Sequence, residues 1–248
     1  MLKNWRVYWR LSALIVSMLS YLSIIIGRQI FLGQNEPHAL RIRQRWTTMA
    51  LKILGLRVQV QGTIPEHHGL VVSNHKCLID PVIILSKMVV IPVGKAEIAG
   101  YPLVGKAAEI TGILFLDRKN KESHQATRDG IRRFLQKERS ILIFPEGTTF
   151  SKPGIRDFKK GSFEIAAEEK VAVIPLAIDY AHQDLIWHEG DSTWSHFKRA
   201  FQHRSTQITL HIGSAIKNDQ SAELLTSART FILNALGQSG DDKNLSKP

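Results

Sequence analysis

The sequence holds only one cysteine, Cys77, so no disulfide can form within the chain. A free thiol is typical of a protein whose folded part faces a reducing, cytosolic compartment. Acidic residues are also few, because 22 Asp and Glu face 33 Lys and Arg and leave a formal net charge of +11. Such an excess favours an anionic partner, whether phospholipid headgroups, a phosphorylated substrate, an acidic carrier protein or nucleic acid, although it also serves solubility alone.

Several motifs that mark other functional classes are missing from the sequence. There is no Gly-x-Ser-x-Gly elbow of a serine hydrolase, no recognisable nucleic-acid-binding motif and no internal repeat. We therefore expect no nucleic acid among the partners. The histidines lack the spacing of metal ligands, so we expect neither a metal site nor a bound cofactor. These histidines are His67, His68, His182, His188, His196 and His203.

Formal charge is absent from residues 11–27, a run of seventeen residues rich in Leu, Ile and Val. As a helix this run would be about 25 Å long, against a hydrocarbon core of about 30 Å. Trp5, Trp9 and Tyr21 suit a membrane interface. A cleaved secretion signal fits less well because residues 27–29 lack a small-x-small cleavage site. A buried core helix seldom lacks charge for this long. We predict a permanent membrane anchor that spans the bilayer or dips into one leaflet.

Residues 39–54 place Arg41, Arg43 and Arg45 among Ile, Trp, Met and Leu side chains. This mixture predicts an amphipathic helix that lies beside anionic lipid. An ordinary surface helix is the alternative interpretation of the same pattern.

Short runs rich in Val, Ile and Leu then alternate with segments suited to helices. The predicted strands are residues 57–61, 69–73, 89–93, 112–116, 140–144, 171–178 and 207–212, and the predicted helices are 79–87, 121–137, 162–169 and 222–236. This alternation predicts an α/β fold with a mixed, mostly parallel sheet of about seven strands flanked by helices and preceded by the N-terminal membrane-anchoring helical segment. We divide the chain into the anchor and amphipathic helix at 1–55, an α/β domain at 56–236 and a flexible tail at 237–248.

Two predicted strands end in turns that carry chemically useful side chains. The first turn contains His75 and Asp80. A histidine accepts a proton near neutral pH, and a carboxylate on its other ring nitrogen would hold the tautomer and stabilise the imidazolium. A separation of five residues does not make neighbours on a regular helix, but the two side chains can meet where a strand turns into a helix. Cys77 lies between them, and a covalent route through its thiolate is a second possibility.

The second turn is Phe144-Pro145-Glu146-Gly147-Thr148-Thr149. A proline sets the backbone, a glycine permits close approach of a ligand, and the threonines offer hydroxyls and amides. The Glu146 carboxylate is suited to hydrogen bonds with acceptor hydroxyls. An ordinary strand-exit turn with an exposed Glu is the alternative.

These turns and two further strands resemble the glycerolipid acyltransferase family, which includes bacterial 1-acylglycerol-3-phosphate acyltransferases. The matching segments are Asn74-His75 followed after four residues by Asp80, then Gly112-Ile113-Leu114-Phe115-Leu116-Asp117-Arg118, Phe144-Pro145-Glu146-Gly147-Thr148 and Val173-Ile174-Pro175-Leu176. Two shorter stretches, Val93-Gly94-Lys95 and Phe158-Lys159-Lys160-Gly161, also look like recurring segments of the family. The resemblance extends over residues 58–178, and four motifs in the family's order are specific.

The resemblance implies a role for each matching residue. His75 would be the general base with Asp80 as its partner, and Arg118 would bind the phosphate of the acceptor. The turn from Glu146 through Gly147 to Thr148 would shape the acceptor pocket. Arginine suits bidentate phosphate binding, while Lys95 and Lys159 are weaker phosphate ligands.

The implied reaction moves a fatty acyl group from acyl-CoA or acyl carrier protein onto the free hydroxyl of a lysophospholipid, first of all 1-acylglycerol-3-phosphate. Many relatives that act on this acceptor carry an arginine where this chain has Thr149. Another lyso-lipid, such as lyso-ornithine lipid, is therefore an alternative acceptor. A non-catalytic basic module that binds an anionic membrane surface is the alternative from another class. For the enzyme, we expect membrane association with the catalytic domain facing the cytoplasm.

Overall fold

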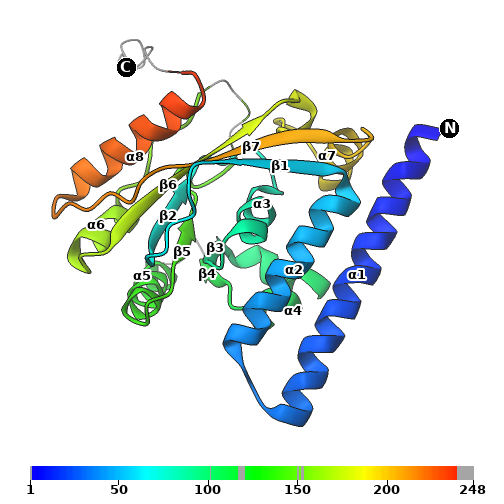
Figure 1. The fold of residues 1–248 in the computed structure, drawn as a ribbon, viewed down its shortest axis with the longest axis horizontal. Helices are drawn as coiled ribbons and strands as arrows, with labels where there is room; N and C mark the ends of the chain where they lie inside the picture. Colours follow the sequence, from blue (N-terminus) through cyan, green and yellow to red (C-terminus); the bar gives the residue numbers. More distant parts are fainter. Residues whose placement is uncertain (1, 101, 117–120, 150, 152–153, 239–248) are drawn as a thin grey trace.

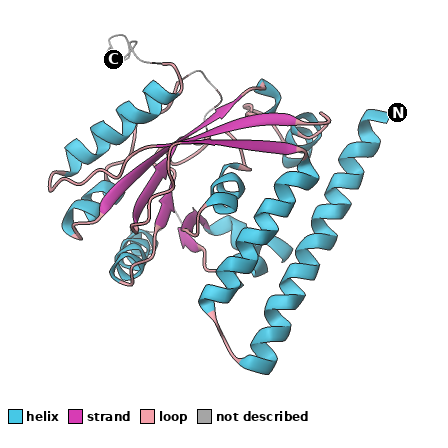
Figure 2. Ribbon diagram, in the orientation of Figure 1, coloured by secondary structure: helices cyan, strands magenta, loops and turns pink. Residues whose placement is uncertain are grey.

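The computed structural model describes residues 2–100, 102–116, 121–149, 151 and 154–238. Its centre is a seven-stranded sheet in the order β1-β7-β6-β2-β5-β3-β4 (Figures 1 and 2). The strands are β1 (Leu56–Gln61), β2 (Gly69–Ser73), β3 (Ile91–Lys95), β4 (Leu114–Leu116), β5 (Ile141–Ile143), β6 (Ala172–Tyr180) and β7 (Thr206–Ile212). Within the described chain β6 and β7 pair antiparallel, and each other neighbouring pair is parallel. The predicted α/β class and mixed, mostly parallel sheet are confirmed.

Helices cover both faces of this sheet (Figure 1). The helices after the first two are α3 (Asp80–Lys87), α4 (Pro102–Ile110), α5 (Lys121–Gln136), α6 (Gly161–Glu168), α7 (Thr193–Ala200) and α8 (Ser221–Ala235), with short 3-10 turns η1 (Ala96–Gly100) and η2 (Gln183–Leu185). The central strand β2 is buried along its whole length, with Val71 packed in one core layer and Leu70 and Val72 in the other. Burial on both faces explains why this strand is a continuous apolar run rather than an alternating one.

Every predicted strand except 69–73 begins or ends at a different residue in the structure, and three of these differences have a physical reason. The strand expected at 89–93 begins at Ile91, where pairing with β5 starts, and runs on to Lys95. The strand expected at 112–116 begins at Leu114, because Gly112 is in the left-handed region (φ +72°) and closes α4. The strand expected at 171–178 extends to Tyr180, because β7 pairs with its last residues.

Two helices, α4 and α7, were not predicted from the sequence. Helix α7 is short and polar, and its start is set by a reciprocal capping box between Ser192 and Ser195. Such a cap stabilises a helix too short for a clear apolar period. Most of the tail predicted at 237–248 lies outside the described residues.

The chain begins with a helical hairpin, α1 (Leu2–Leu32) and α2 (Glu36–Leu54), that lies along one side of the molecule (Figure 1). Helix α1 is 31 residues long, well beyond the uncharged run at 11–27. Its part from Trp5 to Leu32 is long and apolar enough to cross a membrane by length and composition, with a mean hydropathy of 1.8 in its most apolar window. Large apolar side chains stay exposed on it, among them Trp5, Trp9, Val16, Leu19, Ile24, Phe31 and Leu32.

Helix α2 packs into the protein rather than presenting all of its arginines to lipid. Arg41 and Arg45 are exposed, as an amphipathic surface helix requires. Arg43 is buried and donates hydrogen bonds to the backbone carbonyls of Thr111 (2.7 Å) and Val90 (2.5 Å). The expectation of an arginine face beside anionic lipid is therefore wrong for Arg43, which joins α2 to the segments that follow α3 and α4.

Candidate active site

The polar centre of the molecule is the turn that joins β2 to α3. Asp80 is the first residue of α3 and has no exposed surface. Its Oδ2 accepts hydrogen bonds from the backbone amides of Lys76 (2.7 Å) and Cys77 (2.9 Å) and from Nδ1 of His75 (2.8 Å). The turn thus wraps around the carboxylate, and this brings residues five apart in sequence into contact.

The hydrogen bond to Asp80 also assigns the tautomer of His75. A carboxylate accepts, so Nδ1 of His75 carries the proton and Nε2 carries the lone pair. The His75 side chain is 18% exposed, whereas that of Asp80 is fully buried. The pair has the geometry of a general base with an orienting carboxylate, and the histidine is the more accessible of the two side chains.

Strand β6 supports this turn from the neighbouring position in the sheet. The hydroxyl of Tyr180 donates to the second carboxylate oxygen of Asp80. Burial, followed by the nearby Asp80 charge, raises the pKa of Tyr180 well above its usual value, so the phenol remains a donor. Asn74 lies behind the turn, where its amide group exchanges two hydrogen bonds with the backbone of Ile178 (2.8 and 3.0 Å).

The turn after β5 lies next to the turn after β2. The ring of Phe144 stacks on the ring of His75, with 4.3 Å between centroids and 22° between planes. The strands β2 and β5 are parallel neighbours, so both turns leave the same edge of the sheet. Phe144 therefore limits the movement of the imidazole by packing against its face. The hydrogen bond to Asp80 sets the rotation of the ring.

Glu146 is buried (3% exposed) and faces inward. Its Oε1 accepts from the backbone amide of His75 (2.7 Å) and its Oε2 from that of Arg156 (2.9 Å). Burial raises the pKa of Glu146, although these two amide hydrogen bonds and the nearby Lys76 ammonium oppose that shift. The carboxylate thus ties three backbone segments together. An exposed Glu on an ordinary strand exit, the alternative considered from the sequence, is excluded.

Gly147 is in the left-handed region, with φ of +78°, which a glycine adopts without strain. A Cβ at this position would lie 3.0 Å from both Cε and Nζ of Lys159. Lys159 is exposed, and its backbone amide donates to the carbonyl of Pro145 (3.0 Å). The structure therefore brings Lys159 directly over the turn. Thr148 follows Gly147 and is partly exposed.

The remaining cations considered from the sequence lie in different places. Lys95 is exposed at the end of β3, which is parallel to β5 and ends at the same edge of the sheet. Arg118 lies outside the described residues, two positions beyond the end of β4. Lys76 was not given a role from the sequence, yet its side chain is buried and its ammonium donates to the carbonyl of Gly154.

Cys77 has no exposed surface, and its sulfur lies 3.4 Å from Nε2 of the buried His196. Burial raises the pKa of this thiol well above its usual value. Both facts contradict the covalent route, because a nucleophilic cysteine needs access and a thiolate. Tyr180 and Phe144 were missed as supports of the site. Tyr180 lies one alternation beyond Ile178 on the same face of β6, so a longer strand prediction would have placed it in this core layer.

Comparison with known proteins identifies the family of this chain. Residues 56–179 match the family model described as acyltransferase. The lyso-ornithine lipid O-acyltransferase of Pseudomonas aeruginosa is 33% identical over 144 residues, which are 58% of this chain and 55% of that protein. The 1-acyl-sn-glycerol-3-phosphate acyltransferase of Haemophilus influenzae is 30% identical over 171 residues, which are 65% of this chain and 70% of that protein.

The chain spans about half the length of several curated relatives it matches, such as the 1-acyl-sn-glycerol-3-phosphate acyltransferase of Limnanthes alba (51%). Among solved structures, the 1-acyl-sn-glycerophosphate (LPA) acyltransferase of Thermotoga maritima superimposes with a TM-score of 0.77 over 95% of both chains, at 19% identity. That likeness shows the fold. Because the family model covers half of the 248 residues, the chain belongs to the acyltransferase family.

Proposed function

We propose that this protein transfers a fatty acyl group from a thioester, acyl-CoA or acyl carrier protein, to the free hydroxyl of a lysophospholipid. The observation that carries this proposal is the contact between His75 and the fully buried Asp80. An acceptor hydroxyl needs to lose its proton as it attacks. Because Nδ1 of His75 is bonded to Asp80, the lone pair on Nε2 is available to accept that proton.

The reaction then follows from the assigned tautomer. The acceptor hydroxyl gives its proton to Nε2 of His75 while its oxygen bonds to the thioester carbonyl carbon. Asp80 stabilises the imidazolium that forms. The tetrahedral intermediate collapses as the carbon–sulfur bond breaks, and the proton passes from Nε2 to the departing sulfur. The products are the new ester and a free thiol, and His75 returns to its starting state without a cofactor.

The acceptor that we favour is 1-acylglycerol-3-phosphate, which would yield phosphatidate. Lys159 lies over Gly147, which follows the Glu146 that holds the backbone of His75, and Lys95 ends a strand at the same sheet edge. We assign the phosphate to these lysines together with Arg118, whose position in the chain follows β4. Glu146 acts in this proposal by holding the backbone of His75, and Gly147 and Thr148 form the adjoining wall of the acceptor pocket.

Lyso-ornithine lipid is the second candidate acceptor, and two observations favour it. A lyso-ornithine lipid acyltransferase is among the relatives at 33% identity. In addition, Thr149 stands where many phosphate-binding relatives carry an arginine, and it removes a cation from the presumed headgroup site.

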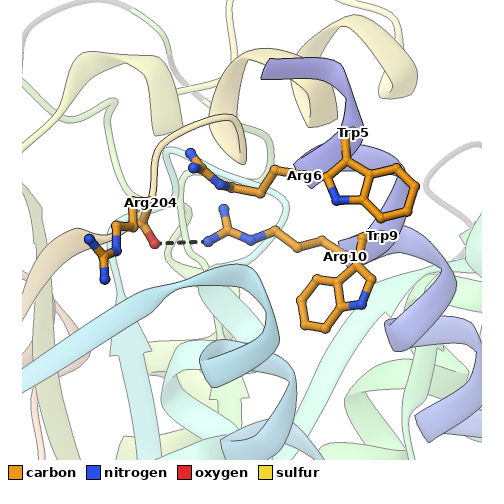
Figure 3. A pocket seen from close by; sticks show the side chains of 5 residues that line it. All are labelled: Trp5, Arg6, Trp9, Arg10 and Arg204. Atoms are coloured by element: carbon orange, nitrogen blue, oxygen red, sulfur yellow. Dashed lines mark hydrogen bonds between the residues drawn. The ribbon is translucent and has the colours of Figure 1, made fainter. Parts of the chain in front are cut away.

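We further propose that α1 anchors residues 1–55 in a membrane and that the catalytic domain at 56–236 faces the cytoplasm. The exposed apolar side chains of α1 and the net charge of +11 support this arrangement. Near the start of α1, Trp5 and Trp9 with Arg6, Arg10 and Arg204 line a surface pocket of about 380 Å³ (Figure 3). Aromatic rings beside guanidinium groups suit the level of anionic headgroups.

Flotation of the purified protein with anionic but not neutral vesicles tests the surface charge. Loss of flotation only after removal of residues 1–32 tests the anchor.

The decisive experiment offers detergent-solubilised protein a panel of lyso-lipids with a labelled acyl donor. We expect free thiol only when an acceptor is added, and an acylated phosphate lipid as the product identified by mass spectrometry. A product formed from lyso-ornithine lipid alone would replace the favoured acceptor with the second. No transfer to any acceptor, with intact membrane binding, would favour the non-catalytic module instead.

A further inference from the structure

Three side chains converge next to the segment that follows β6, away from the catalytic turn. His182 and Asp184 lie at the start of η2, and His203 lies in the loop between α7 and β7. One potential metal-binding atom from each lies within 4.8 Å of the others. Nε2 of His203 is 2.6 Å from Oδ2 of Asp184, and Nδ1 of His182 is 3.5 Å from the same oxygen. The sequence separations of two and nineteen residues did not reveal this group.

The orientation of these groups suits a metal. The backbone amide of Asp184 donates to Nδ1 of His182 (3.3 Å), so that nitrogen carries a lone pair. Oδ2 of Asp184 lies 2.6 Å from Nε2 of His203, so both atoms face the same point. The side chains remain between a quarter and a half exposed, so an ion in solution reaches them.

The two distances from Oδ2 of Asp184 bracket the value expected for a tetrahedral centre, and the two imidazole nitrogens lie within 4.8 Å of each other. Zinc binds imidazole nitrogen and carboxylate oxygen at about 2.0–2.1 Å, which places ligand atoms roughly 3.3 Å apart. The observed separations of 2.6 and 3.5 Å lie on either side of that value. Two imidazoles and a carboxylate are a ligand set that zinc accepts, with a water in the fourth position.

We propose that His182, Asp184 and His203 bind one Zn²⁺ ion. Zinc would replace the hydrogen bond between His203 and Asp184, with the ring proton of the neutral imidazole on Nδ1, and binding weakens as the pH falls because protons compete for the ligand atoms. The long hydrogen bond to Nδ1 of His182 is given up to the ion. This site goes beyond acyl transfer and does not depend on it.

The two segments that the ion joins each support another part of the molecule. The backbone carbonyl of His203 accepts a hydrogen bond from Arg10 of α1 (2.7 Å), and Figure 3 shows that guanidinium reaching the same loop at Arg204. On the other side, the segment after η2 donates from the amide of Trp187 to the carbonyl of Lys76 (2.8 Å) in the catalytic turn. Zinc would therefore fix the position of the loop that binds α1 relative to the turn between β2 and α3.

The test uses the full-length protein in detergent, stripped with a chelator and titrated with Zn²⁺ against a chromophoric indicator. We expect one zinc ion per chain and a rise in Tm on loading. His182→Ala and His203→Ala should each lose that ion and the rise in Tm. His67→Ala and His188→Ala, which remove exposed histidines outside the cluster, should keep both.

Acyl transfer by the zinc-free protein is measured separately, so a failure of the proposed reaction would leave the zinc result intact. Absence of binding to the wild-type chain would overturn the proposal. An unchanged stoichiometry in the double variant His182→Ala/His203→Ala would do so as well, because the ion would then sit elsewhere.

Discussion

The turn between β2 and α3 and the first helix depart from the usual pattern of burial in opposite directions. In the turn, polar groups are buried: Asp80 and Glu146 are 0% and 3% exposed, and their carboxylate oxygens accept hydrogen bonds from donors nearby. On α1, large apolar groups are exposed, with Phe31 at 85% and Trp5 at 70%. Each departure costs free energy in water. The buried carboxylates of the turn are explained by a chemical role, whereas the exposed apolar side chains of α1 are explained by an apolar surface that covers them.

The two regions also differ in how they are attached to the sheet. The turn is held by side chains that bond to backbone amides within the domain. Helix α1 reaches the α/β domain through arginines that donate to backbone carbonyls of the loop at 201–204, chiefly Arg10. The following changes test whether function lies in the first set of contacts and attachment in the second.

The largest effect is expected from His75→Ala. We expect kcat to fall by about 10³-fold, because general-base catalysis contributes roughly 10²–10⁴-fold. The Tm should change little, since the ring is partly exposed. Asp80→Asn should lower kcat comparably, because an amide would favour the wrong tautomer. His67→Ala, at the opposite end of β2, is the matched control. Undiminished turnover in His75→Ala would refute the general-base role.

Arg10→Met should affect stability rather than chemistry. Arg10 is 5% exposed and donates to the carbonyls of Phe201, His203 and Arg204 at 2.7–2.9 Å. Leaving buried carbonyls unpaired should lower the free energy of unfolding by about 3 kcal/mol. Arg6→Met, which removes one such bond to Gln202, should cost less. Thermal unfolding in detergent measures both. Equal, negligible effects would mean that α1 is held mainly by packing against α2.

The contribution of the turn to the free energy of unfolding, unlike that of α1, should depend on pH. The group responsible is His196, which contacts Cys77 in the turn. Burial, then the charge of Arg199, lowers the pKa of His196 from 6.5 to about 4. The folded state therefore binds this proton less readily than the unfolded state does. The contribution to stability is complete above pH 6.5 and is lost as the pH falls toward 4, by roughly 2–3 kcal/mol.

The measurement is the Tm at pH 7.5 and pH 4.5 for the wild type and for His196→Gln. The difference between the two proteins isolates this histidine from other groups such as Glu146, whose raised pKa also makes stability depend on pH. The variant should lose less stability between these pH values than the wild type. A parallel loss in both proteins would contradict the assignment.

The smallest effect is expected from Gly147→Ala. An alanine at φ +78° is strained by about 1 kcal/mol, and its Cβ would push the Lys159 side chain aside. We expect KM for the phosphorylated acceptor to rise several-fold with kcat nearly unchanged. Lys159→Gln should give the same split without the strain. A fall in kcat alone would place Gly147 in the support of His75 instead.

Much of the fold could be predicted from the pattern of apolar residues. Strand β2 begins and ends where its run of Leu, Val and Ser predicts, because it is buried on both faces. Strand β4 could not be located as well, since its start depends on how Gly112 closes a helix that was not predicted. The length of α1 was underestimated for a related reason: charged residues at its ends continue the helix without belonging to its apolar run.

The sequence by itself determined the family and the class of sheet, and it singled out His75 and Asp80 as candidates, because motif order and strand period are properties of the chain read in one direction. Only the tertiary structure decided which groups surround that pair. Tyr180 reaches the turn from β6 and Glu146 from the turn after β5, and His203 reaches Asp184 from the loop before β7. Contacts of this kind depend on which strands become neighbours, and that order is set by packing rather than by distance along the chain.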